Sequence, residues 1–179
     1  MAKINYKKKP KNPRLCELLM TEFLQDAATL VDDNGTPLYI HLTKSNGFYS
    51  FINDDEIRIS YNYSELASPD PADIEFARNF HLRAPFSVGF SDLTLSLLHE
   101  LGHFETESNL PTYYNRDECL AQIDRWETKD KRVIQLLYCS LPDEYLATQW
   151  AINWLADPEN RKKAKKFEKK FFKAWRGEK

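Results

Sequence analysis

The segment 91–104, SDLTLSLLHELGHF, constrains the fold and chemistry of this chain more than any other stretch. Read as a helix, it places His99 and His103 one turn apart on the same face. Two imidazoles at this spacing can bind one metal ion, and in a catalytic zinc site a third protein ligand and an open position for water complete the coordination. Zinc lowers the pKa of such a water toward about 7, and a neighbouring carboxylate, here Glu100, can take its proton. The pattern therefore predicts a hydrolytic zinc site.

The surroundings of these residues favour a metal site over a chance match on a surface helix. Much of the helix circumference is apolar, through Leu93, Leu97, Leu98, Leu101 and Phe104. Such a helix is expected inside a domain, where histidines and a carboxylate without partners would be costly. Gly102 costs about 1 kcal/mol relative to alanine within a helix, so we expect another backbone or a ligand to come close there.

The third ligand is expected to be a carboxylate that follows the motif. The other two histidines of the chain, His41 and His81, both precede it. Glu144 is the best candidate, because it lies near the start of a helix predicted over residues 140–155. Glu118 is the runner-up.

Small residues distinguish the Glu144 helix from the helix of the runner-up. Ala147 and Ala151 share a face with Glu144, and small side chains allow this helix to approach the histidine helix closely. Thr148 lies one turn below Glu144 and is a candidate to bond one of the ligands. Glu118 lacks such a face, although Ala121 follows it.

The chain resembles the minimal gluzincins of the ImmA/IrrE type in two motifs, HELGH at 99–103 and EYLATQWA at 144–151. Those proteins are small intracellular zinc metallopeptidases, many of them carried by phages and mobile elements. The resemblance implies that His99, His103 and Glu144 are the zinc ligands and that Glu100 is the catalytic base. It extends over roughly residues 35–156, with the two motifs carrying nearly all of it.

Three further side chains are candidates for stabilising a developing oxyanion, a role that tyrosine or histidine fills in other zincins. They are Tyr113, Tyr114 and His81. For each of them, packing or contact with solvent is the simpler interpretation.

The net charge of −2 conceals a strong asymmetry. Residues 1–14 hold six Lys/Arg and no acid, and residues 161–179 hold ten Lys/Arg against two Glu. The segment 15–160 has nine basic and 25 acidic residues, a formal charge of −16. An acidic body of this kind repels nucleic acid, so contact with nucleic acid is expected, if anywhere, through 161–179.

A helix is predicted from Arg14 to about Val31, followed by three short strands at 38–42, 48–52 and 57–61. Turn residues between successive strands predict an antiparallel meander. We therefore expect an α+β fold, in which a short antiparallel sheet packs on the motif helix and further helices follow.

The predicted organisation has three parts: a basic tail over 1–13, a zincin-like metallopeptidase domain over 14–160 and a basic amphipathic helix over 161–179. No run approaches the length of apolar sequence that spans a membrane, and the N-terminus lacks the apolar stretch of a secretory signal. A cytoplasmic protein without a membrane span is expected.

Together these patterns predict a zinc-dependent metallopeptidase that hydrolyses peptide bonds of an intracellular protein substrate. The resemblance points to a regulator of a phage or mobile element as that substrate. Two alternatives remain open. One is a zinc-binding interaction protein without catalysis, and the other is a nucleic-acid-associated protein that acts through 161–179.

Overall fold

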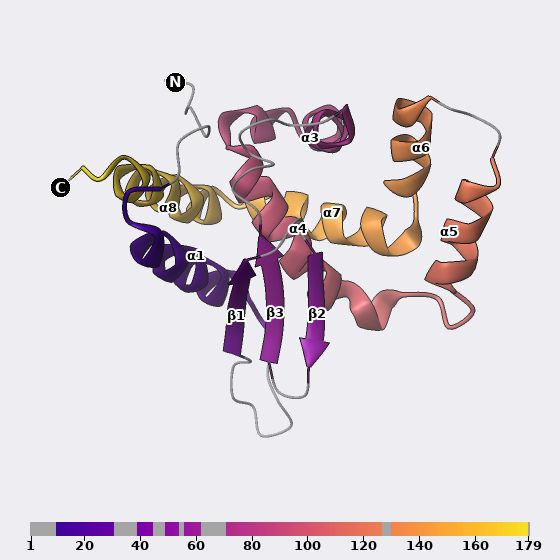
Figure 1. Cartoon of the computed structure of the whole chain (residues 1–179), viewed down its shortest axis with the longest axis horizontal. Helices are drawn as coiled ribbons and strands as arrows, with labels where there is room; N and C mark the ends of the chain where they lie inside the picture. The colour runs from indigo at the N-terminus through magenta and orange to yellow at the C-terminus, as the bar shows by residue number, and fades with distance from the viewer. Residues whose placement is uncertain are drawn as a thin grey trace.

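A computed structural model of the chain describes residues 10–30, 39–44, 49–53, 56–61, 71–126 and 130–178. Helices account for most of these residues, and a small sheet lies beside them (Figure 1). In chain order the elements are α1 (Pro13–Ala27), β1 (Tyr39–Lys44), β2 (Tyr49–Asn53), β3 (Glu56–Tyr61), α3 (Pro71–Arg83), the 3-10 helix η1 (Pro85–Gly89), α4 (Asp92–Thr106), the 3-10 helix η2 (Glu107–Asn109), α5 (Arg116–Asp124), α6 (Lys131–Tyr138), α7 (Pro142–Ala156) and α8 (Pro158–Arg176).

Helix α4, which carries the two histidines, lies at the centre of the core. Ser91 caps its start by accepting a hydrogen bond from the backbone N–H of Thr94 at 3.3 Å. Eleven of its 15 residues are buried, so the helix contacts protein around nearly all of its circumference. This confirms the prediction that the motif helix lies inside the domain.

Helices α4 and α7 approach each other closely at Gly102. A Cβ atom at position 102 would lie only 2.5 Å from the backbone oxygen of Ala147. Ala147 and Ala151 are both fully buried. The structure thus confirms that a backbone comes close to Gly102 and that small residues of α7 face α4.

The last helix, α8, lies along α1 (Figure 1). Its aromatic side chains Phe167, Phe171 and Trp175 are buried. Phe167 stacks on Phe23 with ring centroids 4.3 Å apart and planes 6° from parallel. The helix begins at Pro158, three residues before the predicted start, because Asp157 caps it by accepting from the N–H of Glu159 at 2.7 Å.

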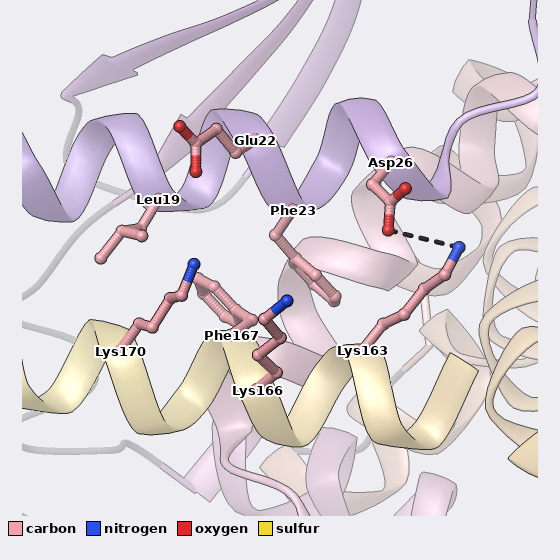
Figure 2. Close-up of a pocket in the computed structure, with 8 residues that line it drawn as sticks. All are labelled: Leu19, Glu22, Phe23, Asp26, Lys163, Lys166, Phe167 and Lys170. Carbon is pink, nitrogen blue, oxygen red and sulfur yellow. Dashed lines mark ion pairs between the residues drawn. The ribbon is translucent and has the colours of Figure 1, made fainter. Parts of the chain in front are cut away.

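A groove between α1 and α8 carries charges of both signs (Figure 2). Lys163 forms an ion pair with Asp26 at 3.3 Å, and Lys166 and Lys170 stand along the same side of the groove. The residues that line it are Leu19, Glu22, Phe23, Asp26, Lys163, Lys166, Phe167 and Lys170. None of them belongs to the predicted metal motif, so this groove is separate from the candidate metal centre.

Glu168 joins α8 to the beginning of α4. This carboxylate is buried and accepts hydrogen bonds from the backbone N–H of Ser91 at 2.6 Å and from the hydroxyl of Thr94 at 2.8 Å. A negative charge at a helix N-terminus satisfies donors that lack an intrahelical partner and is favoured by the helix dipole. The start of the motif helix is therefore held by the last helix of the structure.

The sheet differs from the predicted meander. Its order is β1-β3-β2, with β1 parallel and β2 antiparallel to the central strand β3. The prediction of an α+β fold with a short antiparallel sheet is therefore wrong: the fold is mainly helical, and its small sheet is mixed. Turn residues indicate where the chain reverses and not which strands pair, and here Ile40 of β1 and Ile59 of the central strand β3 are both fully buried in the core.

Helix α1 ends at Ala27, four residues before the predicted end near Val31. The carboxylate of Glu105, at the end of α4, accepts hydrogen bonds from the backbone N–H groups of Thr29 at 2.6 Å and Leu30 at 3.3 Å. Without Glu105, these two N–H groups could have donated to carbonyl groups of the preceding turn and continued the helix. The chain therefore leaves the helix and turns toward α4.

Helices α5 and α6 lie at one end of the molecule (Figure 1). Neither helix contains a fully buried residue, and α6 packs mainly on α3. These two helices are thus the least embedded helical part of the fold.

Within the part of the chain that the structure describes, no helix combines the length and apolar character needed to cross a membrane. Most of the predicted basic tail, residues 1–9, lies outside the described residues.

We expect Gly102→Ala to lower the free energy of unfolding by about 1–3 kcal/mol, although alanine favours a helix, because the new methyl group meets the backbone of Ala147. Urea unfolding of the metal-free protein measures this change. Gly89→Ala is the matched control, since its Cβ would meet only the Lys165 side chain at 3.5 Å, an ordinary contact. Equal stability of the two variants would contradict the close approach.

Candidate metal centre

The structure brings His99, His103 and Glu144 together where α4 meets α7. One ligand atom from each lies within 4.8 Å of the others. Oε2 of Glu144 is 3.0 Å from Nε2 of His99 and 3.8 Å from Nε2 of His103. Three donors that converge in this way can hold one metal ion, as the sequence predicts.

Thr148 contacts the other side of His99. Its hydroxyl oxygen lies 3.1 Å from Nδ1 of His99, and both side chains are buried. If Nδ1–H donates to Thr148, the lone pair of Nε2 points toward the cluster, which is the tautomer a metal ligand needs. The edge-to-face ring of Phe76, centred 4.9 Å away, further confines the imidazole. Thr148 therefore lies beside His99, one of the three candidate ligands.

Arg116 adds a group that the sequence analysis missed. Its Nη2 donates to Oε1 of Glu144 at 2.8 Å and to the hydroxyl of Tyr138 at 2.7 Å. Its Nη1 forms an ion pair with Asp143, which also accepts a hydrogen bond from the hydroxyl of Tyr114. No motif marks Arg116, because it lies 28 positions from Glu144 on a separate helix.

Two further carboxylates are predicted as possible members of the site, Glu100 and Glu118. Glu100 directly follows His99 on α4 and is buried, with 8% of its surface exposed. Glu118, the runner-up ligand, is exposed on α5 and is not part of the cluster. Glu144 is thus the carboxylate that the fold brings to the histidines.

The three oxyanion candidates do not gather at the cluster. Tyr113 is 88% exposed, and Nδ1 of His81 lies 2.7 Å from the hydroxyl of Ser87. Tyr114 is nearest to the site, but its hydroxyl donates to Asp143. In the structure Tyr113 thus faces solvent, His81 contacts Ser87 and Tyr114 contacts Asp143, and their role in stabilising an oxyanion stays a prediction.

Burial and neighbouring charges favour the ionisation states that a metal requires. Burial and the adjacent His99 lower the pKa of His103 to about 4, so its imidazole is neutral at pH 7. Burial alone would raise the pKa of Glu144, but the contacts with His99 and His103 outweigh it and hold this pKa below its usual range. A neutral imidazole and an ionised carboxylate are ready to coordinate without first losing a proton.

The donor set suits zinc. Two imidazole nitrogens and one carboxylate oxygen are the ligands of one group of catalytic zinc sites, which keep a further position open. The same donors also accept other divalent transition metals, so the cluster could hold a metal ion without selecting zinc alone. The side chain of His103 is 20% exposed, whereas that of His99 is 5% exposed, so the cluster reaches solvent at His103.

No family model matches this chain, and neither the curated proteins nor the solved structures contain a match.

We expect Thr148→Val to weaken zinc binding about 10–100-fold, because valine keeps the shape of threonine but cannot accept the bond that orients His99. Thr148→Ser keeps the hydroxyl and is expected to stay near the wild type. Titration of zinc against a chelator of known affinity measures both. Equal losses in the two variants would show that packing, and not the hydroxyl, matters at this position.

Proposed function

We propose that this protein is a metal-dependent peptidase of the gluzincin class. His99, His103 and Glu144 are its metal ligands and Glu100 is its catalytic base. The observation that carries the proposal is the convergence of the three ligand atoms within 4.8 Å at the contact of two buried helices. Zinc is the metal we propose, since the donors fit it and the sequence motif is typical of zinc enzymes.

Each residue of the site has a defined task in peptide hydrolysis. Zinc held by the three ligands would supply a Lewis acid that polarises the substrate carbonyl. The carboxylate of Glu100 takes a proton from the attacking water and passes it to the nitrogen of the leaving amine. Thr148 orients the ring of His99, and the burial of Glu100 keeps bulk water from competing for its proton.

The proposed substrate is a protein or peptide that reaches the cluster from the exposed side of His103. The resemblance to small gluzincins of mobile elements supports an intracellular regulatory protein as the natural target. A zinc-binding interaction protein without catalysis shares the same ligands and differs only in lacking hydrolysis, so the Glu100 variant below separates the two functions.

A second candidate function, contact with nucleic acid, is favoured by one surface. Helix α8 exposes six lysines: Lys162, Lys163, Lys166, Lys169, Lys170 and Lys173. Lysines on one helix can bind a phosphate backbone in a salt-dependent way. Two of them are already paired with acids, Lys162 with Glu159 and Lys163 with Asp26, which reduces the charge available.

The metal content of protein purified without added metal or chelator tests the ligand assignment. We expect about one zinc per chain in the wild type, its loss in Glu144→Ala and its retention in Glu118→Ala, because only Glu144 reaches the histidines. Elemental mass spectrometry gives the count. A wild type that stays free of zinc even after reconstitution would refute the metal centre.

We expect Glu100→Gln to keep zinc and the fold but to lose hydrolysis by about 10²–10⁴-fold, since an amide cannot accept the proton from water. Mass spectrometry of a peptide library incubated with each protein measures cleavage, and elemental analysis confirms that zinc is bound. Cleavage by the variant at the wild-type rate would rule out Glu100 as the base. Zinc binding without any cleavage by the wild type would favour the interaction protein.

A further inference from the structure

The two carboxylate oxygens of Glu144 have different partners. Oε2 lies 3.0 Å from His99 and 3.8 Å from His103, on the side where the ligand atoms converge. Oε1 instead accepts a hydrogen bond from Nη2 of Arg116 at 2.8 Å. The guanidinium thus occupies one oxygen and leaves the other directed at the histidines.

We propose that Arg116 is a positioning residue of the metal centre, which holds Glu144 so that one defined oxygen is presented to the metal. The inference rests on the proposed metal binding by His99, His103 and Glu144. Arg116 itself touches neither the metal nor the substrate in this role. It acts through the carboxylate that it binds.

The geometry of arginine suits this task. A carboxylate on a short side chain can rotate and offer either oxygen, or both, to a cation. A planar guanidinium with several fixed donors restrains that rotation. Nη2 donates at the same time to Tyr138 at 2.7 Å, so the guanidinium is itself held on two sides. A hydrogen bond to the part of a ligand that faces away from the metal is a common means of raising metal affinity.

The charge of Arg116 would oppose a nearby metal ion if it were not balanced. Asp143 forms an ion pair with the other terminal nitrogen of Arg116 and is itself buried. The hydroxyl of Tyr114 donates to the same carboxylate. The Arg116–Asp143 pair is therefore neutral as a unit, and the guanidinium can orient Glu144 without repelling the cation strongly.

The same contacts tie the least embedded helices to the metal centre. Arg116 is the first residue of α5, and Tyr138 is the last residue of α6. Both meet at Glu144, although neither helix contributes a fully buried residue. The orientation of the ligand thus depends on how the ends of these two helices are placed.

Zinc titration of Arg116→Ala tests the proposal, with Arg125→Ala as the matched control. Arg125 is an exposed arginine at the end of α5, so its removal changes the charge of the same helix without touching Glu144. We expect zinc affinity to fall about 10–100-fold in Arg116→Ala and to stay within about twofold in Arg125→Ala. Thermal unfolding of each metal-free protein verifies that the variants are folded.

Two further readouts and one further variant separate positioning from a general loss of structure. Methylguanidinium added to Arg116→Ala should restore part of the affinity, because the side chain is 36% exposed and its removal leaves a site for the ion. The visible spectrum of the cobalt-substituted protein should change in Arg116→Ala and not in Arg125→Ala. Arg116→Lys, which retains the charge and the stem, should bind zinc more weakly than the wild type, because one ammonium cannot reproduce the planar fork.

Wild-type zinc affinity and an unchanged cobalt spectrum in both Arg116 variants would overturn this inference alone. A wild-type protein that binds no metal would overturn the metal centre, and the inference with it. A wild type that binds zinc but cleaves no peptide would refute the peptidase and leave the role of Arg116 standing.

Discussion

The contact of α4 and α7 at Gly102 determines the rest of the site. Only a residue without a Cβ allows the backbone of Ala147 to come so near to α4. His99 and His103 lie on either side of Gly102 along the chain, and Glu144 and Thr148 on either side of Ala147. Joining the helices at this one point therefore brings the three candidate ligands and Thr148, the partner of His99, together, and a shift of one turn in either helix would separate them.

The parts of the site that follow helical spacing could be predicted from the sequence. His99, His103, Glu144 and Thr148 occupy regular positions on two helices, and the small residues between them signal close packing. Arg116 could not be predicted, because its contact with Glu144 depends on how α5 and α6 return to the core, and no periodic pattern encodes that path.

The fold, like the site, could be predicted only where local sequence patterns encode the structure. Local patterns locate α1, α4, α7, α8 and most of each strand, but pairing between strands is set by distant contacts. The meander prediction assumed that successive strands pair, whereas β1 pairs with β3, and Ile40 and Ile59 of these two strands are both buried in the core. The end of α1 depends likewise on Glu105, a carboxylate that is 76 positions from Thr29.

The bond between Glu168 and the start of α4 has a consequence for the order in which the protein matures on the ribosome. Glu168 follows Thr94 by 74 positions, and Glu144 follows His99 by 45. A nascent chain that has just produced the histidine helix therefore has neither Glu144, the third candidate ligand, nor the carboxylate that bonds the first turn of the helix. The three candidate ligands can therefore come together only after translation has passed Glu144, and the first turn of α4 gains its carboxylate partner 24 residues later still.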